Sequence, residues 1–235
     1  MDSSDMDSDD DVSKIRALNE VGIALSAERD HTVLLEQILT SARELVDADA
    51  GTLYTHNAEK RQLDFAIVQN DTLGTYLGGP GKPLGDGFTF VPLYEADGQP
   101  NDHQVVAYSA LNDCTVNIDD AYCAEGFNFS GTRAFDRATG YRSRAILTVP
   151  MHDHENEIVA VLQLLNKRPT NRAGETGFSD TDRHIAESLA SQAAVAITNQ
   201  RLIADMKALF DSLARVIATA IDAKSAHTGA HCRRV

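Results

Sequence analysis

The sequence has few cysteines and few basic residues, and it lacks any long apolar run. Its three cysteines, Cys114, Cys123 and Cys232, are an odd and sparse set that suits a reducing compartment better than a disulfide framework. Lysine and arginine number 21 against 35 aspartates and glutamates, and the net charge of -14 argues against nucleic acid or an anionic membrane as partner. There is neither a run of 18 apolar residues nor a basic-then-apolar leader. We therefore expect a cytoplasmic protein with no membrane span and no signal peptide.

The motifs of several common catalytic sites are absent as well. The sequence has no P-loop, no Gly-x-Ser-x-Gly nucleophile elbow and no Cys-x-x-Cys pair. Its 235 residues, 43% hydrophobic and 24% charged, are enough for one sizeable core in one or two domains. The main body of the chain is therefore expected to bind a ligand and not to catalyse a reaction.

The N-terminal part begins with an acidic segment. Residues 1–11 contain six aspartates and no basic residue, so they cannot bury enough apolar surface to fold and are predicted to be a disordered tail. Apolar residues at steps of three and four then predict a first helix, with the stripe Ile15, Leu18, Gly22 and Leu25. Asp30 is a suitable N-cap for a second helix. Its expected buried face is Leu34, Leu35, Ile38, Leu39, Leu45 and Val46.

The remaining pattern predicts an antiparallel sheet. Residues 70–103 hold most of the glycine and proline and are predicted to be loop, and Val105–Leu111 is predicted to be a helix. The expected strands are Ala50–Thr55, Gln62–Gln69, Thr115–Ile118, a strand from Arg142, and Ile158–Asn166. The expected fold class is α+β, with helices on one side of the sheet and a lid on the other.

The stretch Asn117–Met151 carries most of the functional information. Its first part is rich in Gly, Asn, Asp and Ser, yet it holds four aromatic residues that need a buried place, Tyr122, Phe127, Phe129 and Phe135. This combination predicts a compact lid of loop and helix. From Arg142 the alternation of side chains predicts a core strand. A lid that continues directly into a core strand is a natural wall for a ligand pocket.

Three motifs in order carry a family resemblance. The run N-I-D-D-A-Y is followed by F-D-x-x-T-G-Y-R-S-R-A-I-L-T-V-P-M and then by V-L-Q-L-L-N-K. Together they resemble a GAF domain over about residues 15–200, in the branch with the cyclic-nucleotide-binding GAF domains of phosphodiesterases and adenylyl cyclases. The runs V-P-L-Y-E-A-D-G-Q-P-N and F-N-F-S-G-T-R-A-F-D resemble more specifically the GAF domains fused to bacterial HD-GYP phosphohydrolases. The resemblance implies a GAF fold and a sensory domain at residues 12–177, for which cAMP and cGMP are candidate ligands. The residues alone leave the ligand open, because a glutamine and a few hydroxyls suit adenine, guanine or a non-nucleotide equally well.

The resemblance also implies a set of ligand-binding residues. They are Asp136, Thr139, Ser143 and Gln163, with Val105 and Val106 in the place of a short helix that offers backbone contacts. A glutamine can both donate to and accept from a purine edge, and hydroxyls and backbone N–H groups bind phosphate. Because a buried glutamine without partners is costly, Gln163 is expected to face a ligand, a water or another polar group. Asp136 and Thr139 could instead cap a turn within the lid.

A further family feature is a buried contact between the last strand and the last helix. The chain has Asn166 and Lys167, then Phe178 and Asp182, with Arg183 where the family has Glu. The resemblance implies an architectural Lys167–Asp182 pair. The alternative is an exposed pair that contributes less than about 1 kcal/mol.

The C-terminal part predicts a long helix at residues 178–222. Its seam follows steps of four and three through Ile185, Leu189, Gln192, Ala196, Asn199, Ile203, Met206, Phe210, Leu213, Ile217 and Ala220. Such a pattern is typical of a coiled coil, which predicts a parallel homodimer with Asn199 as the residue that sets the register. The alternative, a helix packed on the sheet of its own domain, suits the first two heptads.

Residues 223–235 resemble the opening of an HD-GYP domain, in which D-x-K-S-x-x-T-G-x-H-C-x-R-V precedes a metal-binding body. The motifs that name that domain would lie beyond Val235. His227 and His231, at i and i+4, would contribute to a divalent metal site (Fe or Mn) only in a full-length HD-GYP domain. Otherwise they are solvent-exposed. No cofactor is expected in residues 1–235 themselves.

Our leading hypothesis is therefore the sensory GAF domain of an HD-GYP cyclic-di-GMP phosphodiesterase that signals through a dimeric helix. The alternative is a GAF domain that binds nothing and serves as a dimerisation platform. A third possibility, a redox or haem sensor, is disfavoured because the chain has no Cys-x-x-Cys-His and no histidine from Tyr122 to Tyr141. Some GAF domains reduce methionine sulfoxide with cysteines, but buried or incidental thiols are the simpler account of the cysteines here.

Overall fold

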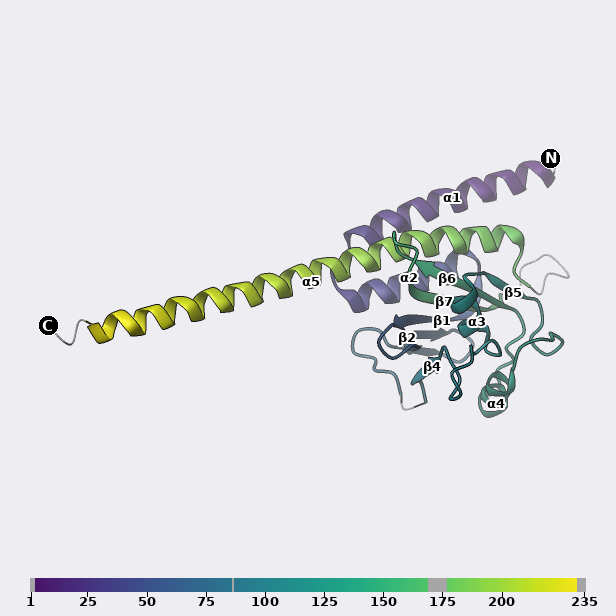
Figure 1. The fold of residues 1–235 in the computed structure, drawn as a ribbon. Helices are drawn as coiled ribbons and strands as arrows, with labels where there is room; N and C mark the ends of the chain where they lie inside the picture. Colours follow the sequence, from purple (N-terminus) through teal and green to yellow (C-terminus); the bar gives the residue numbers. More distant parts are fainter. Residues whose placement is uncertain (1–2, 86, 169–176, 232–235) are drawn as a thin grey trace. The chain divides into compact units, whose positions relative to one another are not determined.

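The computed structural model describes residues 3–85, 87–168 and 177–231, with side chains described between 13 and 219 (Figure 1). The chain divides into two compact units, Met1–Ile197 and Thr198–Val235. The strands are β1 Ala48–Asn57, β2 Gln62–Asn70, β3 Thr75–Leu77, β4 Phe90–Pro92, β5 Val116–Ile118, β6 Ile146–His152 and β7 Ile158–Lys167. The helices are α1 Ser3–Ala27, α2 His31–Leu45, α3 Val105–Asn112, α4 Ser130–Thr139 and α5 Asp180–His231.

The first unit is built on one antiparallel sheet with the strand order β3-β2-β1-β7-β6-β5, and β4 pairs with β2 beside this path. Helices α1, α2 and the start of α5 cover one face, and α3 and α4 lie on the other (Figure 1). We call these the helix face and the lid face. The predicted α+β class, with an antiparallel sheet and a long C-terminal helix, is confirmed. No helix among the described residues is long and apolar enough to cross a bilayer.

The helix face is stabilised by one apolar core. Asp30 caps α2 as predicted, because its carboxylate accepts from the N–H groups of Thr32 and Val33 at 2.9 and 3.0 Å. Leu39 of α2 is fully buried and packs so close to the sheet that a Cβ on Gly51 would lie 2.8 Å from its Cδ1. The close approach of helix and strand explains why glycine stands at this strand position.

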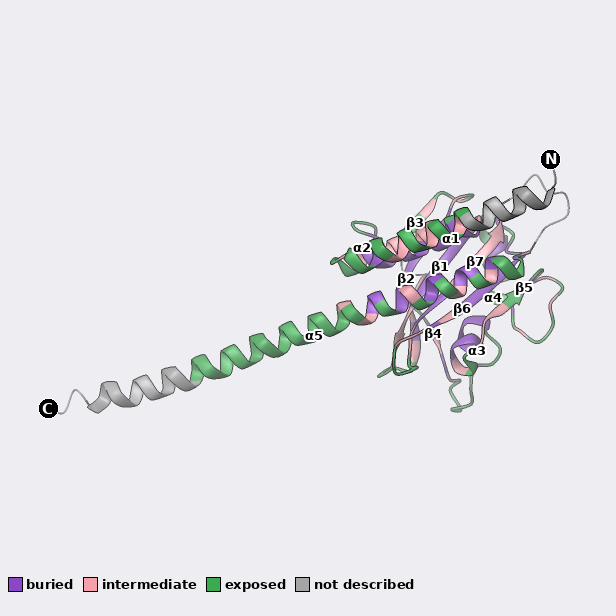
Figure 2. Ribbon diagram, turned by 90° about the horizontal axis from the view of Figure 1, so that it is seen from above, coloured by how far each residue is buried: buried purple, intermediate pink, exposed green. Residues whose placement is uncertain are grey.

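Helix α5 has two different environments. Between Asp180 and Ile197 its apolar residues except Val195 are buried, which agrees with a helix packed on its own domain. From residue 201 to residue 219 every described residue is exposed. Figure 2 shows buried residues on the strands and on the first part of α5, and exposed residues along its later part. The change coincides with the boundary between the two compact units at Thr198.

The structure differs from the sequence prediction in three places. Helix α1 begins at Ser3, where a disordered tail at residues 1–11 was expected. Short strands β3 and β4 lie inside the predicted loop at residues 70–103. The strand expected from Arg142 begins only at Ile146, because the backbone N–H groups before it donate to side chains and not to a neighbouring strand. Ser143 N–H donates to Asp136. The N–H groups of Arg144 and Ala145 donate to Asn166.

Candidate functional site

A row of polar side chains crosses the middle of the lid face. Thr52 on β1 and Thr148 on β6 are both paired in register with Gln163 on β7. The Gln163 amide donates to Thr148 Oγ1 at 3.2 Å and accepts from the Tyr54 hydroxyl at 3.5 Å. Gln163 is half-buried, whereas its neighbours Leu162 and Leu164 are fully buried on the other face. Gln163 therefore has protein partners, and its contact with Tyr54 is at the long limit of a hydrogen bond.

Sequence reasoning identified Gln163 but missed its partners. Burial raises the pKa of the Tyr54 phenol, against a smaller lowering by the hydrogen bond with Thr52, so Tyr54 stays neutral and remains a donor. Thr52 and Thr148 are 6% and 0% exposed. The signal that singled out Gln163, a polar residue at an inward position of an apolar strand, applies to both threonines too.

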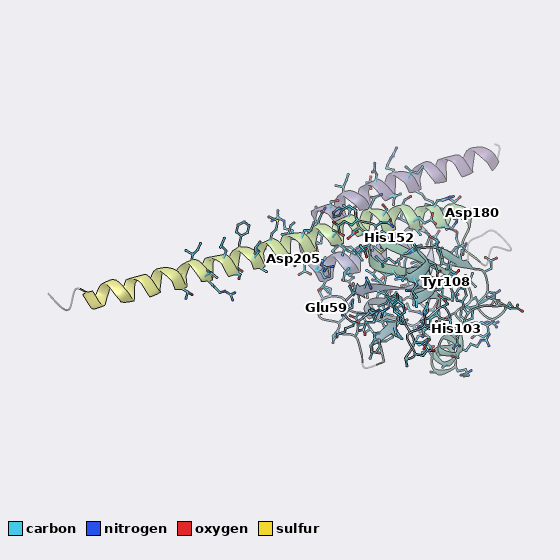
Figure 3. The ribbon with its side chains drawn as sticks, in the orientation of Figure 1. Glu59, His103, Tyr108, His152, Asp180 and Asp205 are labelled. Atoms are coloured by element: carbon cyan, nitrogen blue, oxygen red, sulfur yellow. The ribbon has the colours of Figure 1, made fainter. Side chains whose placement is uncertain are left out.

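Aromatic side chains lie beside this row. The Tyr54 and Phe65 ring centroids are 4.6 Å apart, and Phe65 lies 5.5 Å from Phe88. On α3, Tyr108 (Figure 3) contacts Phe127 edge-on at 5.2 Å. Flat aromatic surface beside a Gln amide is suited to a planar heterocycle, since the rings stack and the amide binds its edge.

The two predicted valines lie at the start of α3, side by side in sequence but in different apolar clusters. Val106 packs with Tyr54 and Val161, and Val105 packs with Phe129 and Ile146. The N-cap residue Gln104 makes no side-chain capping bond. The first turn of α3 therefore keeps backbone N–H groups that no capping side chain satisfies.

Asp136 is the centre of the lid. The residue is 5% exposed, and its carboxylate accepts from the Tyr122 hydroxyl at 2.7 Å and from Ser143 N–H and Oγ at 2.9 Å each. Two of the predicted ligand residues, Asp136 and Ser143, thus bond to each other. The hydrogen bond to Asp136, followed by burial, raises the pKa of Tyr122. As described, Asp136 and Ser143 fix the fold of the lid.

Thr139 lies at the end of α4 and is exposed. Its Oγ1 donates to Phe135 O at 2.9 Å and accepts from Tyr141 N–H at 3.3 Å, and Gly140 follows with φ 74°. Thr139 therefore closes the helix, as the capping alternative expects. Phe135, expected in the lid core, is 40% exposed. It lies on the solvent side of α4, whereas Phe129 is buried.

The lid is joined to the end of the sheet by contacts between residues far apart in sequence. Tyr141 OH donates to Asp49 Oδ2 at 2.7 Å across 92 residues. Burial, together with Asp49, raises the pKa of Tyr141. Asn166 Nδ2 donates to Arg142 O at 2.8 Å. These contacts hold the lid at its junction with β6.

The predicted Lys167–Asp182 contact is present, and the exposed-pair alternative does not apply. The Lys167 ammonium donates to the Asp182 carboxylate, and the side chains are 8% and 2% exposed. Asp182 also accepts from Ser179 N–H and Oγ at 2.8 and 2.9 Å, and its own N–H donates to Ser179 Oγ at 3.1 Å. This reciprocal capping starts α5. One buried carboxylate thus joins the last strand to the last helix.

Two hollows lie away from the polar row, at opposite ends of the sheet. One, of about 360 Å³, lies where β1 turns into β2, and the other, of about 290 Å³, lies beside Asp49 and Tyr141. Neither is lined by Asp136, Thr139, Ser143 or Gln163. Among the described residues, no three His, Cys, Asp or Glu side chains are placed to share a metal ion. His227 and His231 lie outside the residues whose side chains are described.

The two cysteines in the described part of the chain are free thiols, Cys114 half-buried and Cys123 exposed. Burial, with a further contribution from Asp113, raises the pKa of Cys114. A raised pKa keeps the thiol protonated and poorly nucleophilic. The geometry of Cys114 gives no support to thiol chemistry.

The family model described as GAF domain matches residues 30–197. A relative from Takifugu rubripes, "Dual 3',5'-cyclic-AMP and -GMP phosphodiesterase 11A", is 30% identical over 191 residues, which are 80% of this chain and 19% of the relative. The chain thus spans about a fifth of that protein.

Two solved structures share the fold. The GAF domain of a phosphoenolpyruvate-protein phosphotransferase from Coxiella burnetii has a TM-score of 0.61 at 13% identity, over 83% of this chain and 98% of that one. The free methionine-R-sulfoxide reductase of Neisseria meningitidis has a TM-score of 0.57 at 16% identity, over 82% and 93%. At these identities the likeness establishes the fold alone.

Proposed function

The chain belongs to the GAF domain family, and on that basis we propose that it is a sensor that binds a cyclic nucleotide, cAMP or cGMP, on the lid face of its sheet. The observation that carries this proposal is Gln163, a half-buried amide among buried strand residues, beside the Tyr54–Phe65 ring pair. The similarity to a phosphodiesterase named for cAMP and cGMP supports the same class of ligand.

Binding requires the polar row to exchange partners. The 3.5 Å contact between Tyr54 and Gln163 is weak, so a purine edge can replace it at little cost in free energy. The backbone N–H groups at the start of α3 then suit the cyclic phosphate. Asp136, Ser143 and Thr139 already make hydrogen bonds within the lid. We therefore assign them to holding the lid over the ligand. They would contact the ligand only after the lid rearranges.

Isothermal titration with cAMP and with cGMP tests this proposal. Gln163→Leu keeps the volume of the side chain but removes the amide, so we expect at least tenfold weaker binding. Gln192→Leu is the matched control, because Gln192 is also half-buried but lies on α5 against Gly22, on the helix face. Equal cyclic-nucleotide affinities for the wild type and Gln163→Leu would show that Gln163 does not contribute to binding.

A second function, dimerisation, is favoured by the later part of α5. Eight large apolar side chains there are 49% to 69% exposed: Leu202, Ile203, Met206, Leu209, Phe210, Leu213, Val216 and Ile217. They include five residues of the predicted seam, Ile203, Met206, Phe210, Leu213 and Ile217. We propose that a second copy of the chain covers this seam as a parallel coiled coil with Asn199 in it. Phe210→Asp should convert a dimer into a monomer by light scattering, while Ser212→Asp, also exposed but off the seam, should not. A wild-type monomer at micromolar concentration would contradict the coil.

Signalling then follows from differential affinity. A ligand that binds one lid arrangement better shifts the population of that arrangement, and the paired α5 helices pass the bias to whatever follows them. If the ligand proposal fails and the dimer proposal holds, the domain is a dimerisation platform.

The finer proposal, which rests on the sequence resemblance, is that the output is an HD-GYP phosphodiesterase acting on cyclic-di-GMP. Its Fe or Mn ions would be held in that domain, with His227 and His231 contributing. We expect residues 1–235 alone to hydrolyse no cyclic-di-GMP. Hydrolysis of cyclic-di-GMP by this segment with added Mn or Fe would contradict the assignment of catalysis to the HD-GYP domain. In the full-length protein, Gln163→Leu should abolish any response of hydrolysis to cAMP or cGMP.

A further inference from the structure

The groove of about 360 Å³ at the turn end of the sheet has the composition of a binding site of its own. Its lining includes Leu93, Leu111 and Ile158 as apolar surface, and Arg61, His56 and His152 as polar groups. It contains neither Gln163 nor any residue of α4. A ligand in this groove would therefore not contact Gln163 or the lid helix α4.

Arg61 is held in the groove without an ionic partner. Its guanidinium carbon lies 3.6 Å from the centroid of the Tyr94 ring. Among the described residues its side chain makes no ion pair and no hydrogen bond, so its N–H donors are available. Arg61 also has φ 52° in the turn between β1 and β2, a conformation that glycine or asparagine adopts more easily. The turn by itself therefore does not explain an arginine here.

Two histidines lie beside Arg61. His56 Nδ1 lies 2.8 Å from Ile158 O, so Nδ1–H donates to this backbone carbonyl and fixes the ring. His152 (Figure 3) has a buried Nε2 that lies 2.9 Å from Asp113 Oδ1, so this carboxylate is its partner.

The acidic residues of the groove restrict the class of ligand. Asp113, whose side chain is 57% exposed, and the exposed Glu157 both line it. Two carboxylates within one groove repel a multiply charged anion more strongly than a singly charged one. The planar guanidinium of Arg61 matches a carboxylate with two parallel hydrogen bonds. The apolar lining suits an aliphatic body.

We propose that this groove binds a small monocarboxylate with an apolar body, with Arg61 bound to the carboxylate and His56 and His152 beside it. The carboxylate is oriented by the stacked guanidinium, and the body packs on Leu111 and Ile158. The same residues would leave phosphate and neutral amides weakly bound.

NMR titration tests the site with 4-methylpentanoate as the probe, and with 4-methylpentanamide and inorganic phosphate as matched controls. The ring signals of His56 and His152 should shift with the carboxylate and much less with the two controls. Shifts of equal size with the amide would overturn the proposal, because they would reflect apolar contact alone. Shifts of equal size with phosphate would overturn the assignment to a monocarboxylate.

Arg61→Gly gives the decisive variant, because glycine suits the backbone at this position and the melting temperature should be unchanged or higher. Carboxylate affinity should nevertheless fall by about tenfold or more. Arg133→Ala, which removes another arginine stacked on a tyrosine, should bind as the wild type does. If Arg61→Gly has a lower melting temperature than the wild type, Arg61→Lys is the variant to use. Lysine keeps the positive charge but lacks the planar guanidinium, so carboxylate binding should still be weaker. Unchanged affinity in a folded Arg61 variant would overturn the proposal.

The two binding proposals can fail separately. Gln163→Leu should leave carboxylate binding in the groove unchanged, and Arg61→Gly should leave cyclic-nucleotide binding unchanged. Loss of both activities in either variant would mean that the groove and the lid face are not independent sites.

Discussion

The two faces of the sheet are built differently. The helix face has one continuous apolar core made by α1, α2, the start of α5 and the strands. The lid face has two smaller apolar clusters and a row of polar side chains through Gln163. Apolar burial is the main source of folding free energy, whereas polar groups on a partly covered face can exchange partners with a ligand. We therefore expect the helix face to account for most of the stability, and we propose the lid face for ligand recognition.

Both faces also contain buried carboxylates with different partners. Asp182 on the helix face accepts from a lysine ammonium and a helix cap, whereas Asp136 on the lid face accepts from neutral donors only. Losing a charged partner from a buried site costs more than losing neutral hydrogen bonds. The difference can be measured by single substitutions on each face.

The largest expected effect is on the helix face. Lys167→Ala leaves Asp182 as a buried carboxylate without its ionic partner and should lower the free energy of unfolding by about 3 to 5 kcal/mol. Chemical denaturation would measure the loss. Arg183→Ala is the control, because the Arg183–Asp180 pair is exposed and should contribute less than about 1 kcal/mol. Equal losses for the two variants would contradict an architectural role for Lys167.

A smaller effect is expected on the lid face. Asp136→Ala removes the acceptor for Tyr122 and Ser143, and leaving these donors unsatisfied should cost about 1 to 3 kcal/mol. The pKa of Tyr122, which the hydrogen bond to Asp136 raises, should fall toward its ordinary value in an ultraviolet titration. A loss as large as that of Lys167→Ala would mean that the lid belongs to the main core.

The acid response should depend on Asp71, which directly follows β2. Burial acts to raise the pKa of Asp71, but hydrogen bonds from Arg43 of α2, Tyr76 and Arg168 outweigh it and hold the folded pKa at about 2, below the ordinary 3.8. Because the folded pKa is the lower one, this stabilisation is present above pH 3.8 and is lost as the pH falls toward 2.

Melting temperatures measured between pH 5 and pH 2 would test this response. The wild type should lose more stability over this range than Asp71→Asn, in which the titrating carboxylate is absent. Parallel curves for the two proteins would show that the Arg43–Asp71 pair does not govern the acid response.

The sequence was most informative where a signal is local or periodic. The Asp30 cap and the buried stripe of α2 depend on spacing within one segment, and both are as predicted. The Lys167–Asp182 contact came from a family motif and lies across only 15 residues. The sheet followed from strand patterns separated by recognisable turns.

The sequence was least informative where partners lie far apart. The Tyr141–Asp49 hydrogen bond joins residues 92 apart, and no spacing rule selects that pair. Ser143 was predicted to lie in a strand, but its N–H and hydroxyl bond to Asp136 and the strand begins only at Ile146. The groove around Arg61 gathers residues from two turns, α3 and the segment after β4, and none of them was singled out by the sequence.

The measurement that tests the central claim most directly is a thermal melt of residues 1–235 with cAMP, cGMP, cyclic-di-GMP or no ligand. At about 100 times its dissociation constant, a ligand of the folded state should add about 2.7 kcal/mol, which corresponds to a rise of several degrees. The account predicts such a rise with cAMP or cGMP for the wild type, and about half that rise or less for Gln163→Leu at the same concentration, because its binding is at least tenfold weaker. No rise with either nucleotide would contradict the assignment of the lid face as a cyclic-nucleotide site.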